Sequence, residues 1–141
     1  MRNIKLFVRK AYWQALNETI TYKGKKVPCF DMFAPDKAVF PYILLTNQTQ
    51  VDDKDNQEFN YITTITIDVV TGAVAPYGRL DADSIADLIL QKVCLYPENY
   101  LVMEVGKIVT AKLVNQTSLP AISDTNIIHR EILTIENWID G

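Results

Sequence analysis

Few side chains in this 141-residue sequence could carry out chemistry, and they are scattered along it. His129 is the only histidine, and strand alternation places it on the same face as Glu131, where an imidazole could act as a general base. A lone strand histidine is more often a structural or surface residue, however. Asp68 has apolar neighbours on both sides, and we expect it to pair across strands with an arginine or lysine. An enzyme that uses His129 with Glu131 or Asp68 is therefore an alternative and not the main prediction.

Other catalytic motifs are missing from the sequence. Ser84, Ser118 and Ser123 do not lie in the sharp glycine-flanked turn that presents a nucleophilic serine. No GxxxxGK(S/T) or GxGxxG segment occurs, so the chain offers no glycine-rich loop for a nucleotide. We therefore predict that the protein is not an enzyme and that it has no catalytic residues and no cofactor.

The two cysteines do not indicate a metal site. Cys29 and Cys94 lie far apart, form no CxxC motif and have a single histidine to accompany them. Because a structural zinc needs about four nitrogen or sulfur ligands, we predict no metal. A disulfide between the two is an alternative, but reduced and buried thiols are the expectation.

Three triplets match the acceptor pattern for N-glycosylation. They are Asn17-Glu18-Thr19, Asn47-Gln48-Thr49 and Asn115-Gln116-Thr117. The N-terminal segment MRNIKLFVRKAYWQAL has no continuous apolar stretch and no small-residue cleavage site, so we expect no signal peptide. Without secretion the matches are coincidental, and we expect the two identical triplets to mark strand ends.

Composition places the chain among ordinary globular proteins. It is 48% hydrophobic and 22% charged, with a net charge of −3 and a pI near 5.1. An acidic chain without a lysine and arginine cluster does not favour binding to duplex DNA, and the lysines at 23, 25 and 26 are expected to form only a solvated hairpin tip. No window approaches the length of a membrane span. We expect one domain, residues 1–141, folded in a cytoplasm.

Hydrophobic periodicity predicts a short series of elements. These are a helix over 4–16, a small hairpin over 19–30, a loop over 31–38, a strand over 40–46, a strand over 59–69, a helix from Asp81 or Asp83 to just before Pro97, and strands over 108–114 and 127–138. This order predicts an α+β fold. Its expected form is a mostly antiparallel four-stranded sheet with two main helices on one face, plus a small N-terminal hairpin.

Four segments of the sequence, taken in their order along the chain, resemble those of a known protein family. They are VRKAYWQAL, the Pro-Tyr segment FPYI after an Ala-Pro loop, DADSIADLILQKV and the final strand HREILTIENWI. Together they resemble the tail-terminator, or tail-completion, proteins of tailed bacteriophages and the related ring proteins of the head–tail neck. The resemblance covers nearly the whole chain as a pattern of elements, and each stretch alone is weakly specific.

The resemblance implies a structural virion protein of the tail or neck, assembled in the host bacterial cytoplasm. Its subunits would form a closed homo-oligomeric ring of roughly six or twelve copies. The implied partners are further copies of the chain, the portal or connector, and tail-tube or other neck proteins. DNA would pass through the lumen without sequence-specific contact, and the family has no catalytic residues to transfer.

A head-to-tail ring needs two different contact surfaces on each subunit. We predict Trp13, Phe33, Val39 and Phe40 as interface residues, because apolar side chains outside the core stripes can form such patches. An acidic loop that contains Asp52, Asp53, Asp55 and Glu58 is predicted to face the lumen, a partner or solvent. Segments 50–58 and 118–126 are predicted to be loops that order on assembly. A small cytosolic α+β module that binds a ligand or peptide is the alternative function.

Overall fold

The computed structural model describes residues 3–52, 61–73, 78–123 and 126–140 of the chain. In chain order the elements are α1 (Ile4–Leu16), β1 (Thr21–Tyr22), β2 (Lys25–Lys26), β3 (Cys29–Asp31), β4 (Tyr42–Asp52), β5 (Tyr61–Ala73), α2 (Gly78–Val93), α3 (Pro97–Tyr100), β6 (Lys107–Ser123) and β7 (Asn126–Asp140).

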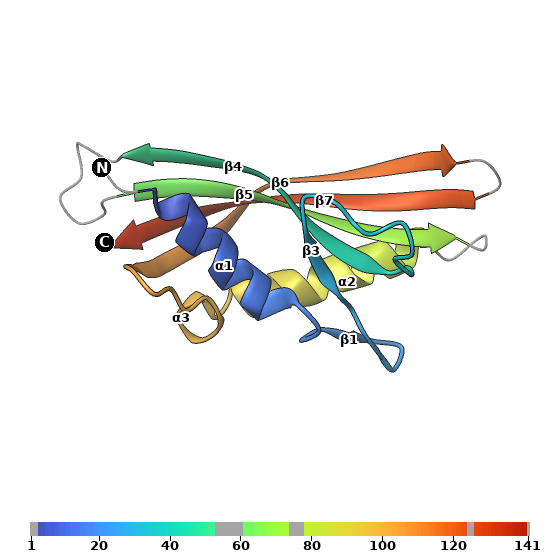
Figure 1. Cartoon of the computed structure of the whole chain (residues 1–141), viewed down its shortest axis with the longest axis horizontal. Coiled ribbons are helices and arrows are strands. Elements are labelled where there is room, and N and C mark those ends of the chain that lie inside the picture. Colours follow the sequence, from blue (N-terminus) through green and yellow to red (C-terminus); the bar gives the residue numbers. More distant parts are fainter. Residues whose placement is uncertain (1–2, 53–60, 74–77, 124–125, 141) are drawn as a thin grey trace.

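These elements form two layers (Figure 1). One layer is a long twisted sheet with the strand order β3-β4-β5-β7-β6, and α1, α2 and α3 all lie on the same face of it. Among the described residues, no helix covers the opposite face, which we call the helix-free face. The core lies between the layers, as expected for one apolar face of a sheet packed against helices. Its largest fully buried side chains include Tyr12, Ile43, Ile65, Ile85 and Ile135.

The predicted mostly antiparallel four-stranded sheet is wrong, because the main sheet has five strands and is mixed. The extra strand, β3, runs parallel to β4 with Cys29 opposite Ile43. The sequence pattern instead predicts this segment as the second arm of the small hairpin. Val27 and Cys29 are buried, so the chain leaves the hairpin after Lys26 and adds an edge strand that places both side chains in the core. The broader prediction of α+β layers with helices on one face agrees with the structure.

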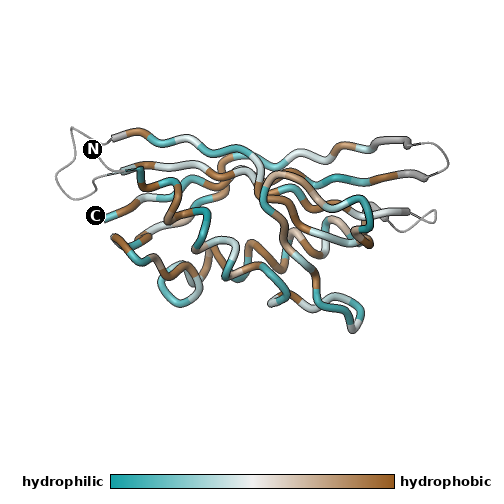
Figure 2. The backbone as a smooth tube through the Cα atoms, in the orientation of Figure 1, coloured by the Kyte–Doolittle hydropathy of each residue, from teal (hydrophilic) through white to brown (hydrophobic). Residues whose placement is uncertain are grey.

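The small hairpin itself has the predicted turn. Lys23 and Gly24 have φ values of 49° and 75°, the left-handed conformation that a two-residue hairpin turn requires. The lysines around the turn are exposed, and Figure 2 shows this tip as strongly hydrophilic.

The first helix follows the predicted stripe. Ile4, Val8, Ala11 and Tyr12 are buried on the side that faces the sheet. The Tyr12 hydroxyl donates to Asn137 Oδ1 of β7, so the buried polar groups of helix and sheet satisfy each other.

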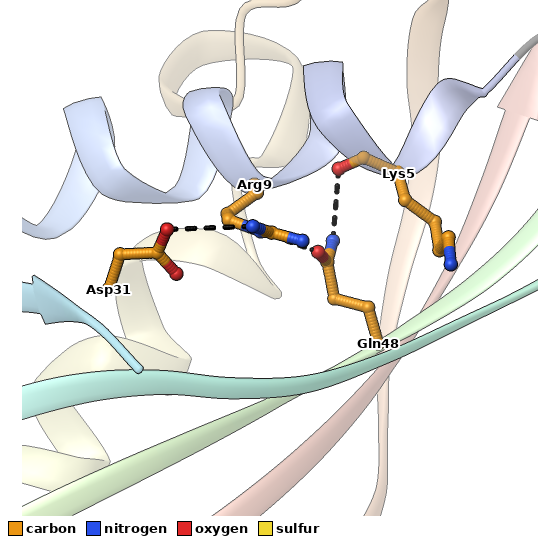
Figure 3. Close-up of polar contacts among 4 residues, drawn as sticks. All are labelled: Lys5, Arg9, Asp31 and Gln48. Atoms are coloured by element: carbon orange, nitrogen blue, oxygen red, sulfur yellow. Dashed lines mark hydrogen bonds and ion pairs between the residues drawn. The ribbon is translucent and has the colours of Figure 1, made fainter. Parts of the chain in front are cut away.

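Polar contacts also attach α1 to the β3 edge of the sheet (Figure 3). Gln48 Nε2 of β4 donates to the Lys5 carbonyl oxygen at 3.0 Å. Arg9 Nε donates to Gln48 Oε1 at 2.7 Å, and Arg9 Nη1 lies 3.4 Å from Asp31 Oδ2 of β3. One arginine therefore bridges two neighbouring strands from the helix above them.

The long strands extend beyond their predicted ends. The segment 118–126 was expected to be a loop, but β6 continues through Ser123 and pairs with β7 residue by residue, from Ser118 opposite Glu131 to Ser123 opposite Asn126. Pro120 is compatible with this because β6 is an edge strand, where a missing backbone N–H disrupts no ladder.

The two Asn-Gln-Thr triplets are not strand ends, contrary to the prediction. Residues 47–49 lie inside β4 at a register shift between Leu45 and Gln48, and residues 115–117 lie inside β6 after a shift between Leu113 and Asn115. Both triplets therefore accompany β-bulges, which absorb extra residues without ending a strand.

The second helix begins earlier than predicted. It starts at Gly78, so Asp81 lies in its first turn and is not its N-cap. Ser84 lies within the helix, where its Oγ donates to the Leu80 carbonyl oxygen at 2.7 Å. Within the described part of the chain, none of the helices has the length and apolar character needed to cross a bilayer.

Candidate functional site

The cluster around His129 does not have the geometry of a catalytic pair. Glu131 is 2% exposed and accepts hydrogen bonds from Ser118 Oγ at 2.5 Å and Gln116 Nε2 at 3.0 Å. His129 lines the same small cavity of about 150 Å³. The carboxylate is thus held by neighbouring strand residues, as in a structural hydrogen-bond network.

The predicted cross-strand partner of Asp68 is Arg130. Asp68 is 1% exposed on the helix-free face, and its Oδ2 accepts bonds from Arg130 Nε at 3.0 Å and from Arg130 Nη2. The hydrogen bond to Asp68 raises the pKa of Arg130. A buried carboxylate with a guanidinium on one oxygen is an ion pair and not a free acid, so the expected pairing is confirmed.

A depression of about 340 Å³ lies between the small hairpin and the start of α2. Its polar side chains bind one another: the Tyr22 hydroxyl donates to Asp81 Oδ1 at 2.5 Å, and Lys23 Nζ lies 3.1 Å from the same oxygen. Burial raises the pKa of Asp81, but the bonds from Tyr22 and Lys23 outweigh it, so this pKa is lowered overall. These groups are already engaged, which disfavours a site that selects a small polar ligand.

Metal and thiol chemistry are not supported by the described residues. They contain no group of three or more His, Cys, Asp or Glu side chains that could hold a metal ion. Cys29 and Cys94 are free thiols rather than a disulfide. Burial, followed by the nearby Asp31 charge, raises the pKa of Cys29 to about 12, so this thiol is an inert core residue.

Three of the four predicted interface residues are exposed. Phe33 and Val39 lie in the connection between β3 and β4 with 80% and 73% of their surface accessible, and Trp13 is 42% exposed on α1. Phe40 is different, because its ring stacks on Tyr42 with centroids 5.5 Å apart and closely covers Gly72 of β5. We call residues 33–39 the 33–39 loop.

Trp13 lines an open depression of about 330 Å³ on the outer side of α1. Its indole Nε1 donates to the Cys29 carbonyl oxygen at 3.0 Å, which fixes the ring against β3. Leu6, another residue that lies off the apolar stripe, borders the same depression and is 56% exposed. Residues outside the core stripe of α1 therefore form an apolar surface beside the β3 edge.

A second exposed apolar surface was missed by sequence reasoning. A groove of about 620 Å³ lies beside the C-terminal half of α2 and is lined by Leu88, Lys92, Leu95, Tyr96 and Tyr100. We call it the α2–α3 groove. Leu95 is 66% exposed and Tyr96 55% exposed. The available signal was the segment LYPENY, where apolar residues follow the end of a helix around a proline.

Lys92 is the charged residue in this groove. Its Nζ donates to the Ala15 carbonyl oxygen at 2.7 Å and lies 4.8 Å from the centroid of the Tyr100 ring. Burial lowers the pKa of Lys92. Among the described residues, no carboxylate lies within ion-pair distance of it.

The predicted acidic loop lies almost entirely outside the described residues. Asp53, Asp55 and Glu58 fall in the segment 53–60, and Asp52 is described only as the last backbone residue of β4. The assignment of these residues to a lumen, a partner or solvent stays a prediction.

Comparison with solved structures shows a match over the full length of the chain. The fold matches a chain in the virion of a native gene transfer agent particle, with a TM-score of 0.76, 16% sequence identity and coverage of 100% of both chains. The sequence matches no protein-family model and no curated protein. The chain therefore shares its complete fold with a component of that particle, at a sequence identity where only the fold is comparable.

Proposed function

We propose that this chain is a structural virion protein that forms a ring at the head–tail junction of a tailed bacteriophage, in a tail-terminator or tail-completion role. The observation that carries the proposal is the full-length fold match to a chain of a gene transfer agent virion. The match extends over every element, which favours the same kind of subunit over a recombined fragment. The sequence resemblance to tail-terminator proteins supplies the specific position within the virion.

The described surface supports assembly better than catalysis. The Asp68 and Glu131 carboxylates are buried and engaged by neighbouring strands. Large apolar side chains are instead exposed in several places, among them the 33–39 loop, the outer side of α1 and the α2–α3 groove. A closed ring of more than two copies requires two such unlike surfaces. The proposal therefore includes that the protein is not an enzyme.

The charge of the chain suits a ring around DNA. With a net charge of −3 the subunit offers no general attraction to phosphates, so DNA would pass without being held. We propose that portal or connector proteins and tail-tube proteins contact the two faces of the ring. Retention of duplex DNA by the purified protein at physiological salt would count against this arrangement.

The test is assembly of the purified protein. Sedimentation velocity across a wide concentration range, followed by negative-stain electron microscopy, is expected to detect closed rings with a central opening, alone or after addition of tail-tube protein. A chain that stays monomeric under all these conditions and binds no tail or portal protein would contradict the proposal. If that chain were also stabilised by a small molecule in a thermal-shift screen, the alternative of a ligand-binding module would be favoured.

A further inference from the structure

We propose that the 33–39 loop of one copy inserts into the α2–α3 groove of the next, with Phe33 among the groove's apolar side chains and Asp36 beside Lys92. The inference rests on the proposed ring and names the contact that builds it. The partner in the groove is thus a second copy of this chain.

The 33–39 loop has the properties of an inserting segment. Phe33 is 80% exposed and Val39 73% exposed, so two large apolar side chains project where the chain itself does not cover them. The loop is also held by its own hydrogen bonds: Phe33 N donates to the Asp31 carbonyl oxygen at 2.8 Å and Ala38 N to the Pro35 carbonyl oxygen at 2.9 Å. A segment that is already ordered loses little conformational entropy on docking.

The α2–α3 groove has complementary properties. Its exposed Leu95, Tyr96 and Tyr100 side chains offer an aromatic and aliphatic surface, and Tyr96 and Tyr100 meet edge to face with centroids 6.4 Å apart. Tyrosines in such an arrangement are typical of protein interfaces, because they combine a large contact area with few rotatable bonds. A phenylalanine ring suits a groove with these walls.

Charge provides the argument for this particular loop. Lys92 is half-buried in the groove, and no carboxylate of the described residues pairs with it. Asp36 is exposed in the middle of the loop and, within the same part of the chain, has no basic partner. A partly desolvated cation without a counterion is unfavourable, and a docked carboxylate would relieve this. The loop thus carries apolar groups and two adjacent exposed charges, Asp36 and Lys37, and the groove carries apolar groups and the Lys92 cation, to which Asp36 is the complementary charge.

The two surfaces lie on different parts of the subunit. The loop continues from the edge strand β3, where Met32 N donates to the Leu45 carbonyl oxygen at 2.8 Å. The groove lies in the helix layer, where α2 and α3 border it on one side and the segment 19–21 on another. A contact between two unlike surfaces of this kind repeats head to tail and can close into a ring.

The first experiment removes each surface separately. Phe33→Ser disables the loop and Leu95→Ser disables the groove. Leu80→Ser is the matched control, because Leu80 is a similarly exposed apolar residue (63%) in the first turn of α2, outside both surfaces. Each of the first two variants is expected to weaken self-association at least about tenfold in sedimentation experiments, as loss of a central interface residue does. The Leu80→Ser protein is expected to associate like the wild type. Circular dichroism and a thermal melt check that all three are folded.

Mixing the two defective variants gives the sharper test. The Phe33→Ser protein keeps its groove and the Leu95→Ser protein keeps its loop, so one intact contact can form between them. Native mass spectrometry is expected to detect a one-to-one heterodimer that does not grow further. As a charge test, Asp36→Lys and Lys92→Glu are each expected to weaken assembly. Their mixture is expected to restore both contacts in alternation, because the two introduced charges pair at one junction and the unchanged Asp36 and Lys92 pair at the next.

The outcomes separate this inference from the proposed function. If the wild type forms rings and neither Phe33→Ser nor Leu95→Ser affects them, the loop-and-groove contact is wrong while the ring stands. If each variant loses assembly but their mixture forms no heterodimer, the contact is also wrong. If the wild type forms no ring alone or with tail-tube protein, both the contact and the ring proposal fail.

Discussion

The same three residues, Asn-Gln-Thr, occur in two strands of this protein with different surroundings. Residues 47–49 lie in β4 and residues 115–117 in β6, and each triplet accompanies a β-bulge. In both, the glutamine lies on the helix-facing side of the sheet, since Gln48 is opposite the core residue Ile65 and Gln116 opposite the core residue Leu133. The two triplets therefore have the same sequence, lie beside the same kind of backbone irregularity and place their glutamine on the same side of the sheet.

The surroundings of the two glutamines differ because only one is covered by a helix. Gln48 is half-buried beneath α1, where it donates to the Lys5 carbonyl oxygen and accepts from Arg9. Gln116 is exposed on the edge strand β6, and its amide donates to Glu131 of the neighbouring strand. An identical triplet can therefore hold a helix on the sheet, as Gln48 does, or bond only to a neighbouring strand, as Gln116 does. The difference is whether a helix covers that part of the strand.

The largest expected effect is on the core beside the covered triplet. Ile65→Ala should lower the free energy of unfolding by about 2–5 kcal/mol, because Ile65 is fully buried and its truncation leaves a cavity. Val114→Ala, beside the second triplet, should cost less than about 1 kcal/mol because Val114 is 48% exposed. Urea unfolding of both variants measures the difference, and equal losses would mean that β6 is as well covered as β5.

The next largest loss of stability is expected when the glutamines themselves are replaced. Gln48→Ala should destabilise the fold by about 1–3 kcal/mol, because it removes one bond to a helix carbonyl and one from the Arg9 guanidinium. Gln116→Ala is the matched control and should cost about 0.5–1 kcal/mol, since Ser118 still donates to Glu131. A larger loss for Gln116→Ala in the same urea titration would reverse the comparison.

The reactivities of the two cysteines allow the β3 side and the β6 side of the sheet to be compared without a mutation. Cys29, in β3, has a pKa raised by burial to about 12, so at pH 8 only about one molecule in ten thousand carries its thiolate. The pKa of Cys94 is also raised by burial, but a backbone hydrogen bond at Leu113 of β6 opposes this and the side chain is only half-buried. Labelling by a thiol reagent at pH 8, followed by peptide mass spectrometry, should modify Cys94 first.

Faster labelling of Cys29 would mean that β3 opens more readily than the β6 side. The sign of the pH dependence follows from the raised pKa. Unfolded Cys29 loses its proton near pH 9.0 and the folded thiol only near pH 12, so this group makes the fold less stable as pH rises through that interval.

The smallest effects are expected at the threonines. The Thr49 hydroxyl lies 2.6 Å from the Thr64 hydroxyl on an exposed surface, and Thr117 lies opposite Ile132. Thr49→Val and Thr117→Val should each change the free energy of unfolding by no more than about 0.5 kcal/mol. A clearly larger loss for Thr49→Val would show that the triplets differ at the threonine as well as the glutamine.

Much of the fold was predictable because its elements are strongly periodic. The stripe that begins at Ile4 and Val8 predicted α1, and alternation through Ile65 and Ile67 predicted β5. Strand β3 could not be predicted in the same way, because a three-residue strand has too short a pattern to distinguish it from a hairpin arm. The extension of β6 past Pro120 was missed because proline and polar residues suggest a loop, whereas an edge strand tolerates both.

The interface role of the four predicted residues stays a prediction, and the structure decides only which of them are exposed. Phe33, Val39 and Trp13 are apolar residues outside any core pattern, and the structure exposes all three. Phe40 has the same chemical character, but its ring covers Gly72, a residue that lies far away in sequence. The α2–α3 groove was missed because LYPENY alone does not form it: the segment 19–21, far away in sequence, lines the same groove.

The sequence by itself determined the apolar periodicities, the acidic charge, the turn at Lys23-Gly24 and the scarcity of groups that could do chemistry. Each of these depends on residue identity or on contacts between near neighbours. Only the tertiary structure decided the parallel position of β3, the pairing of Asp68 with Arg130 and the different roles of Gln48 and Gln116. These depend on which layer covers a side chain, because burial converts an ordinary polar residue into one that must find a partner.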